Sequence, residues 1–190
     1  PLVRAQLDGP ATATLRLASG VRELVNGEDV TLQSLQPRPR IELRDAPLVF
    51  VGYGIDAPER GWNDYKEVDL RGKIAVVLIN DADFHAGQPG AFDGRAVTYY
   101  GRWTYKFEEA ARKGAAAALI IHDAPGAAYG WDVVKNSWSG PQYDLPAKDD
   151  PAPRLPAQGW LSAEAARALF AGAGLDLDKA YRDASKRGFK

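Results

Sequence analysis

Acidic and histidine side chains gather at three places in this sequence where they could take part in metal-dependent hydrolysis. The stretch KFEEAARKGAAAALIIHD, residues 106–123, holds an adjacent glutamate pair and, after an apolar run, a histidine followed by an aspartate. A further acidic stretch, NDADFH, spans residues 80–85. Carboxylate and imidazole groups are ligands that hold zinc in hydrolases. Whether these side chains lie close enough to share a metal ion depends on the strands and helices on which they are placed.

Two of these groups directly follow apolar runs that read as buried strands, KIAVVLI (residues 73–79) and AAAALII (residues 115–121). In open α/β sheets, ligands bind beyond the carboxyl ends of parallel strands, so side chains that follow neighbouring strands can approach one another. A site at this edge would use Asp81, Asp83, His85, His122 and Asp123. One interpretation is therefore a free-standing metal-dependent hydrolase that uses the Asp81, Asp83, His85 and His122 edge.

The spacing at this edge does not match a metal-binding motif. The pair Asp81-x-Asp83 lacks the glycine at position six and the final glutamate of a calcium loop. A catalytic zinc site needs three protein ligands and an open position, so both histidines would have to serve, each from a loop. We expect turns and water to satisfy these side chains, with no metal, no cofactor and no catalytic residue in this chain.

The glutamate pair lies on a predicted helix. Trp103, Phe107 and Ala111 recur at helical spacing and predict the buried face. Glu108 and Glu109 would then turn to solvent, and Glu109 precedes Lys113 by four residues, a favourable ion-pair spacing. The pair is therefore predicted to be a solvated helix face.

This helix connects the two apolar strands, so residues 73–121 are predicted to form a βαβ unit with parallel strands. Strands are predicted before it, and a loop of about twenty residues, 81–100, lies inside it; loops of that length are often functional. A proline-rich connector, residues 140–156, leads to a helix capped by Ser162, and a polar helix follows. The earlier strands are predicted at residues 11–17, 30–35, 40–44 and 47–55.

The composition excludes several classes of protein. Of the 190 residues, 45% are hydrophobic and 26% are charged, with a net charge of −1, which favours neither nucleic acid nor an anionic membrane as a partner. There is no cysteine, which excludes disulfides and thiol catalysis. No apolar run approaches the length of a membrane span. The sequence is that of a globular domain.

Aromatic residues in two long segments predict an interaction surface. The first segment is the loop 81–100, and the second is the tryptophan-rich stretch 129–143. Such side chains either close over a core or bind a partner. A tryptophan-lined sugar- or peptide-binding module is a further interpretation. The residues expected on this surface are Trp131, Trp138, Phe84, Phe92 and Tyr99.

Several motifs resemble the protease-associated (PA) domain of M28-type zinc aminopeptidases. They are LVFVGYGI, then NDY, then VDLRGKIAVVLIND, and finally GRWTYKFEEAARKGAAAALIIHD. The Asp-Leu-x-Gly-Lys turn into a strand and the Lys-x-x-x-Ala-x-x-x-Gly-Ala junction of helix and strand carry the resemblance. It extends from about Pro47 to Ala124 and includes no catalytic motif.

The resemblance implies a small α/β domain with a β-sandwich or barrel-like mixed sheet, a βαβ unit and peripheral helices. Residues 1–46 would be strands leading into the domain, residues 47–160 its core, and residues 161–190 a helical segment toward a peptidase core.

In that family the domain is a non-catalytic accessory that shapes substrate access or mediates protein contacts. Its partners would be the peptidase core of the same parent chain and a peptide substrate, in a secreted or periplasmic protein. Zinc would be bound in the peptidase core, through an H-x-D motif and an adjacent glutamate pair. Neither His85 nor His122 lies in H-x-D, and Glu108 and Glu109 belong to the accessory domain's own helix, so no catalytic residue carries over.

Overall fold

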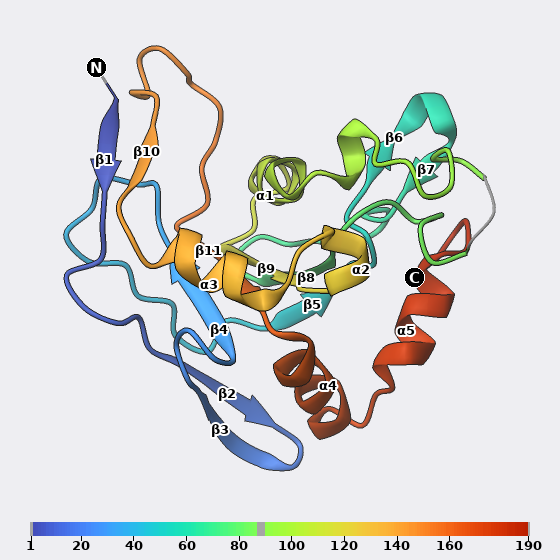
Figure 1. The fold of residues 1–190 in the computed structure, drawn as a ribbon, viewed down its shortest axis with the longest axis horizontal. Coiled ribbons are helices and arrows are strands. Elements are labelled where there is room, and N and C mark those ends of the chain that lie inside the picture. The colour runs from blue at the N-terminus through green and yellow to red at the C-terminus, as the bar shows by residue number, and fades with distance from the viewer. Residues whose placement is uncertain (1, 87–89, 190) are drawn as a thin grey trace.

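A five-stranded mixed sheet forms the centre of the protein in the computed structural model, which describes residues 2–86 and 90–189 (Figure 1). The strand order is β4-β11-β9-β8-β5; β5, β8, β9 and β11 run parallel, and β4 is antiparallel to β11. The strands span β4 (Val30–Gln33), β5 (Leu48–Phe50), β8 (Ile74–Leu78), β9 (Ala117–Ile121) and β11 (Ala157–Leu161).

The predicted βαβ unit is confirmed. Strands β8 and β9 are parallel neighbours, in a register that pairs Ile74 with Ala117 and Leu78 with Ile121, and helix α1 (Trp103–Arg112) connects them. Every residue of β9 is buried, as expected for a strand that is covered on both faces. The small mixed α/β fold is therefore as predicted.

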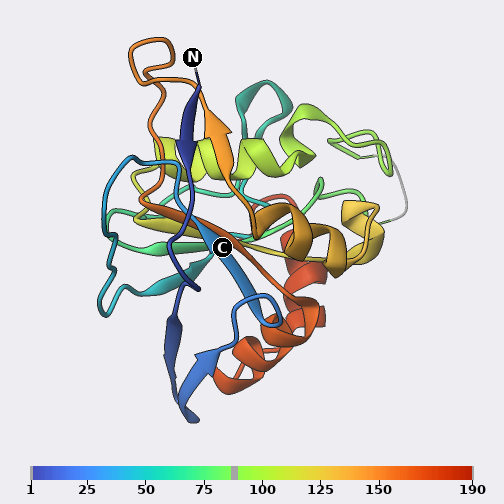
Figure 2. The same ribbon diagram turned by 60° about the vertical axis from the view of Figure 1, so that its left-hand side comes forward.

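Helices cover both faces of the sheet (Figure 2). Helices α1 and α3 (Trp131–Trp138) contribute Phe107, Ala110 and Val134 to the hydrophobic cluster on one face. Helices α4 (Ala163–Gly172) and α5 (Leu177–Ala184) pack on the other face, with the β2–β3 ribbon. The Ser162 side chain accepts a hydrogen bond from the Ala165 N–H, which confirms the predicted cap of α4.

Short elements surround this core. Three two-stranded ribbons pair antiparallel, and Figure 1 shows β1 and β10 beside the N-terminus. The segment 40–44, predicted as a strand, has no regular structure, since its exposed charged side chains offer no apolar face to a sheet. The remaining elements are β1 (Val3–Ala5), β2 (Ala13–Leu17), β3 (Gly20–Leu24), β6 (Asp56–Ala57), η1 (Pro58–Arg60), β7 (Trp62–Asn63), η2 (Tyr99–Gly101), α2 (Ala124–Ala127) and β10 (Gln142–Asp144).

Helix α1 departs from the predicted stripe at two positions. Trp103, expected inside, is 40% exposed, and Glu109, expected in solvent, is only 7% exposed. Glu109 is buried because Lys113 joins it to Asp56 of β6, whose carboxylate accepts a 2.6 Å hydrogen bond from the Lys113 ammonium group. The predicted Glu109–Lys113 pair does form, at 3.3 Å, and Glu108 is exposed as expected.

The side chain of Lys106 is fully buried and connects α1 to the ends of two other segments. Its Nζ donates to the Tyr53 carbonyl at 2.6 Å and to the Asn80 carbonyl at 2.9 Å. Gly52 and Gly54, on either side of Tyr53, have φ values of 57° and 60°, a left-handed conformation that glycine adopts readily. Burial lowers the pKa of Lys106 to about 7, although nearby carboxylates oppose this shift.

Replacing Lys106 with methionine leaves two buried carbonyls without a donor, so we expect Lys106→Met to reduce the free energy of unfolding by about 2–4 kcal/mol at pH 7. The pH dependence also changes. Between about pH 7 and the usual lysine pKa of 10.5, the folded state binds fewer protons than the unfolded state, so wild-type stability rises with pH. Urea unfolding at pH 7 and pH 9 should show this rise in the wild type and not in Lys106→Met.

The exposed Lys148 gives the matched control. Lys148→Met should keep both the wild-type stability and its rise with pH. A rise of equal size in Lys106→Met would contradict the assignment to Lys106.

Candidate functional site

The acidic and histidine side chains do lie along one edge of the sheet. Because β8 and β9 are parallel neighbours, the residues that follow them meet there, and His85 Nε2 lies 2.7 Å from Asp123 Oδ2. The same carboxylate oxygen accepts the Gly126 N–H at 2.9 Å and so caps α2. Burial alone would raise the pKa of Asp123, but the contacts with His85 and the Gly126 N–H outweigh it and lower that pKa. The His85–Asp123 pair therefore attaches the beginning of the loop 81–100 to the N-terminus of helix α2.

The other members of this group serve the fold individually. The buried Asp81 carboxylate accepts from the Thr98 N–H at 2.6 Å and from its hydroxyl at 2.9 Å, and burial raises its pKa. Asp83 Oδ2 accepts from the N–H groups of Gly90 and Phe92, at 2.7 and 2.6 Å. These two carboxylates thus close the loop on itself. Across residues 2–86 and 90–189, no group of three acidic or histidine side chains is arranged to hold a metal ion.

His122 does not join the other residues of the edge; it contacts Tyr129, which lines a pocket elsewhere in the domain. Its ring is buried, which lowers its pKa, and its Nε2 lies 3.0 Å from the Tyr129 carbonyl, which can only accept. Nearby, the Trp131 Nε1–H donates to the Gly27 carbonyl at 3.0 Å. The two contacts hold the turn between α2 and α3 against the sheet.

The five aromatic residues predicted on an interaction surface occupy different environments. Tyr99 is 54% exposed and Phe92 is completely buried against Trp62, so Phe92 offers no surface. Phe84 is half-buried, edge-on to His85. Trp131 and Trp138 are also half-buried, and of the five only Trp138 lines the pocket described next.

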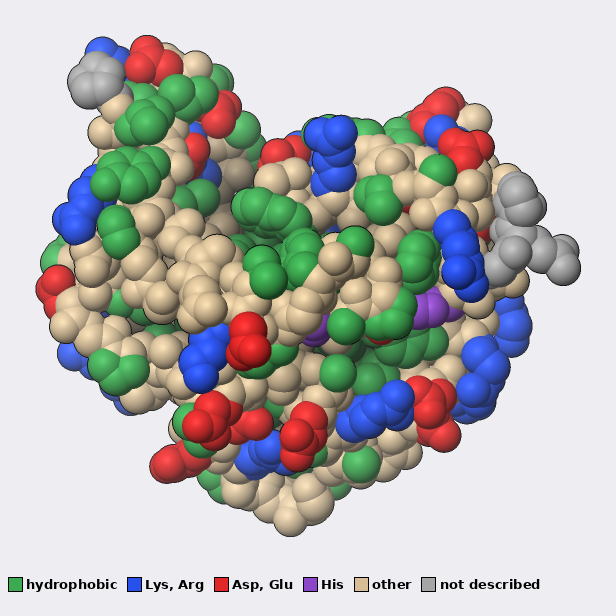
Figure 3. All heavy atoms as spheres, in the orientation of Figure 1, with side chains coloured by type: hydrophobic (Ala, Val, Ile, Leu, Met, Phe, Trp, Pro, Cys, Tyr) green, Lys and Arg blue, Asp and Glu red, His purple; other side chains and the backbone are tan. Residues whose placement is uncertain are grey.

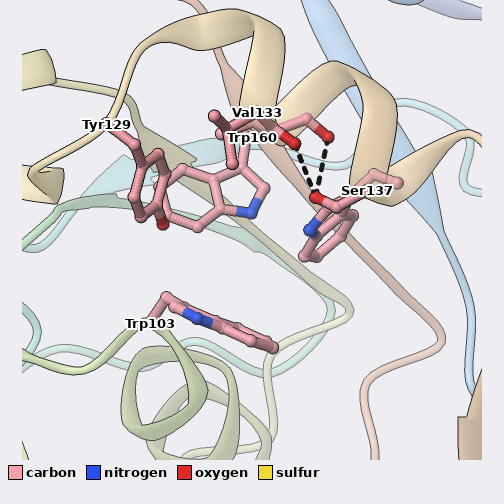
Figure 4. Close-up of a pocket in the computed structure, with 7 residues that line it drawn as sticks. Trp103, Tyr129, Val133, Ser137 and Trp160 are labelled. Carbon is pink, nitrogen blue, oxygen red and sulfur yellow. Dashed lines mark hydrogen bonds between the residues drawn. The ribbon is translucent and has the colours of Figure 1, made fainter.

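An aromatic pocket of about 190 Å³ lies between α1, α3 and the sheet (Figure 4). Trp103 of α1 lies across the pocket from Trp160 of β11, with Tyr129 beside them (Figure 4). Trp138 packs edge-to-face against both Trp103 and Trp160, with ring centroids 6.1 and 6.3 Å apart. We call this space the aromatic pocket; its lining residues are Trp103, Tyr129, Val133, Val134, Ser137, Trp138 and Trp160.

The aromatic pocket contains a buried donor without a hydrogen-bond partner. Trp160 is 1% exposed, and its Nε1 has no acceptor among the residues that the structure describes. The nitrogen lies on the Ser137 side of the ring (Figure 4), but the Ser137 hydroxyl lies close to two carbonyls of its own helix, 2.7 Å from that of Val133 and 3.2 Å from that of Val134. A buried N–H without an acceptor costs free energy, so this one suits an acceptor brought by a ligand.

A second hollow of about 310 Å³ adjoins the aromatic pocket, and the two share Trp103 and Tyr129. It extends over Gly101 and Arg102 at the start of α1 and over Gly126 in α2. Val97, which lines the second hollow, is more than half exposed. Val133, which lines the aromatic pocket, is also more than half exposed. Hydrophobic side chains gather on this face of the molecule (Figure 3). We call the two hollows together the aromatic groove.

Sequence reasoning found this groove only in part. Tyr129 and Trp138 belong to the predicted segment 129–143, but Trp103 was expected in the core, and Trp160 was not among the residues predicted on the interaction surface. The groove depends on side chains from α1, α3 and β11, which only the tertiary structure brings together.

Comparison with known proteins identifies the domain. The family profile described as the PA domain matches residues 44–169, which confirms the predicted resemblance to that family. No curated protein matches the sequence. Among solved structures, the aminopeptidase from Aneurinibacillus sp. strain AM-1 is similar, with 16% sequence identity and a TM-score of 0.32. The match covers 90% of this chain and 31% of the aminopeptidase, so the chain spans about a third of that protein.

The carboxylates at the sheet edge already accept hydrogen bonds from backbone N–H groups, so we expect no specific metal binding there. Zinc or calcium added at about ten times the protein concentration should leave the melting temperature of the purified chain unchanged. His122→Ala, which removes the contact with Tyr129, should lower the stability by about 1–3 kcal/mol whether or not zinc is present. Metal retained in stoichiometric amount after purification, and lost in His122→Ala, would show that the edge is a metal site.

Proposed function

Because this chain belongs to the PA domain family, whose members are protease-associated accessory domains, we propose that it is the non-catalytic accessory domain of a larger zinc aminopeptidase of the M28 type. Its aromatic groove would be the working surface, which contacts peptides or the peptidase core and thereby shapes substrate access. The single observation that carries this proposal is the exposed, aromatic-lined groove on a PA domain.

The groove has the features of a protein or peptide contact. Trp103 and Val133 are exposed beside the buried Trp160, so an apolar pocket opens to solvent through apolar residues. Tryptophan and tyrosine are enriched at binding sites, because their large rings provide contact area with few rotatable bonds. A contiguous apolar surface of this kind is typical of an interaction site.

Zinc, in this proposal, is bound by the peptidase core of the same parent chain. The candidate ligands in this domain fit a metal poorly, because Asp81, Asp83 and Asp123 already accept short hydrogen bonds from the protein. A free-standing hydrolase would need these carboxylates to be released from the loop that they stabilise.

The proposed parent protein also defines the borders and location of the domain. Residues 1–46 would lead into the PA core of residues 47–160, and residues 161–190 would lead toward the peptidase core. Strand β4, from the first segment, pairs with β11 and so completes the central sheet.

We infer a secreted or periplasmic parent protein. No described helix is long and apolar enough to cross a membrane.

A second candidate function is a sugar- or peptide-binding module that acts without a peptidase. The unpartnered Trp160 N–H in a tryptophan-lined pocket favours it, since both ligands bring acceptors. The two functions differ in whether the groove influences the activity of a peptidase.

We expect the isolated chain not to hydrolyse aminoacyl 4-nitroanilides, with or without zinc. In the parent enzyme, Trp103→Ala should lower kcat/KM for peptides by about fivefold to thirtyfold, because truncating a binding-site tryptophan removes about 1–2 kcal/mol of binding free energy. Turnover of a small aminoacyl 4-nitroanilide, which does not reach the groove, should stay unchanged. Steady-state kinetics on both substrates check this.

Val21, a 70% exposed residue of the β2–β3 ribbon, provides the control, and Val21→Ala should leave both activities unchanged. Zinc-dependent hydrolysis by the isolated chain would contradict the accessory role. Equal peptide kinetics in wild type and Trp103→Ala would contradict a role of the groove in substrate access and favour a binding module that does not influence peptidase activity.

A further inference from the structure

We propose that the aromatic groove binds the C-terminal residue of a peptide, with an aromatic side chain in the aromatic pocket and the terminal carboxylate at Arg102 and the start of α1. The proposal rests on the function proposed above only in taking this groove as the working surface. It adds the chemical class of the ligand and its orientation.

The apolar end of the site is the aromatic pocket. Three tryptophan rings and Tyr129 surround it, and the Trp160 N–H is buried without an acceptor among the described residues. An aromatic side chain matches the pocket in character, and a tyrosine hydroxyl would supply the acceptor that Trp160 lacks. The ligand side chain expected here is therefore a tyrosine.

The charged end of the site is the start of α1. This helix of ten residues begins at Trp103, no side chain caps its N-terminus, and its first turn contains no acidic residue. The N–H groups of a first helical turn have no partners within the helix and favour an anion. A carboxylate placed here would accept these hydrogen bonds.

Arg102 adds a positive charge at the same place. Its side chain is exposed, lines the second hollow, and forms no ion pair or hydrogen bond with any other described residue. The Asp81 carboxylate lies against Gly101, the residue before Arg102, where it already accepts hydrogen bonds from the Thr98 N–H and hydroxyl. Glu108 contacts Tyr99 and Arg112. An arginine beside an uncapped helix start complements a carboxylate in charge and geometry.

The geometry joins the two ends within the reach of one residue. The hollows share Trp103, and Arg102 directly precedes it, so a side chain in the aromatic pocket lies next to the start of α1. A residue that presents an aromatic side chain and a free carboxylate together is the C-terminal residue of a peptide. In an aminopeptidase, this site would hold the end of the substrate opposite to the one that is cleaved.

The test uses the peptide acetyl-Ala-Ala-Tyr as the free acid and as the C-terminal amide, with tryptophan fluorescence and calorimetry as readouts. The free acid should bind at least about tenfold more tightly than the amide, a difference typical of one charge-assisted contact. Arg102→Gln should weaken the acid about tenfold and leave the amide unchanged. Trp160→Phe, which keeps an aromatic ring and removes the N–H, should weaken both peptides by about twofold to tenfold.

The exposed Arg38, in the segment between β4 and β5, provides the control, and Arg38→Gln should bind both peptides like the wild type. Since Arg102 and Trp103 are both exposed, their variants are expected to fold, which circular dichroism checks. Equal affinity for acid and amide, an unchanged affinity in Arg102→Gln, or no binding of either peptide would overturn the proposal. A dimer in solution that Trp103→Ala dissociates would also overturn it, because a second copy would then occupy the groove.

Failure here is distinguishable from failure of the proposed function. The accessory role is tested by nitroanilide and peptide kinetics, which do not depend on how a peptide end is held. Loss of peptide kinetics in Trp103→Ala, combined with equal binding of acid and amide, would keep the accessory role and remove the carboxylate site.

Discussion

The buried ammonium group of Lys106 is the contact on which the position of the groove depends. It joins α1 to the carbonyls of Tyr53 and Asn80, so the helix is fixed to the turn after β5 and to the end of β8 at once. An amine that is completely buried is costly unless it is hydrogen-bonded. Here the two carbonyls and the nearby carboxylates offset part of that cost, and the pKa of Lys106 stays lowered to about 7. Because Lys106 follows Trp103 by less than one helical turn, the same contact sets where the first turn of α1 begins. The wall of the aromatic pocket and the start of the helix are thereby held in one rigid unit.

The residues that look catalytic in the sequence serve mainly to hold this groove in place. Asp81 accepts from Thr98, three residues before Gly101, which lines the second hollow. His122 lies close to the Tyr129 carbonyl and positions the opposite side of the aromatic pocket. The polar side chains at the carboxyl edge of the sheet thus already form hydrogen bonds within the domain. In our proposal, aromatic rings and a helix start bind the peptide instead, and these groups supply no chemistry of their own.

Many of the strands and helices of the fold could be predicted from the sequence, whereas most residues of the aromatic groove could not. The continuous apolar runs of β8 and β9 predict two buried parallel strands, and Ser162 predicts the start of α4; both predictions are confirmed. Trp103 and Glu109 were placed on the wrong sides of α1. For Glu109 the cause is a second packing partner, because a single helical stripe assumes one partner and Lys113 joins Glu109 to Asp56 as well. Phe92 looked like part of an exposed loop, but the hydrogen bond from its N–H to Asp83 turns that loop back over the core. Trp160 was not predicted on the interaction surface, since a tryptophan more often closes over a core and its missing acceptor is visible only in three dimensions.

The most direct test of the account is to sequence the coding region on both sides of the segment that encodes these 190 residues. An accessory domain that acts on a peptidase must be encoded with one, so the account predicts a zinc-peptidase core in the same reading frame, with an H-x-D motif and an adjacent glutamate pair. A reading frame that contains this domain and no peptidase would contradict the account, and the groove would then belong to an independent binding module.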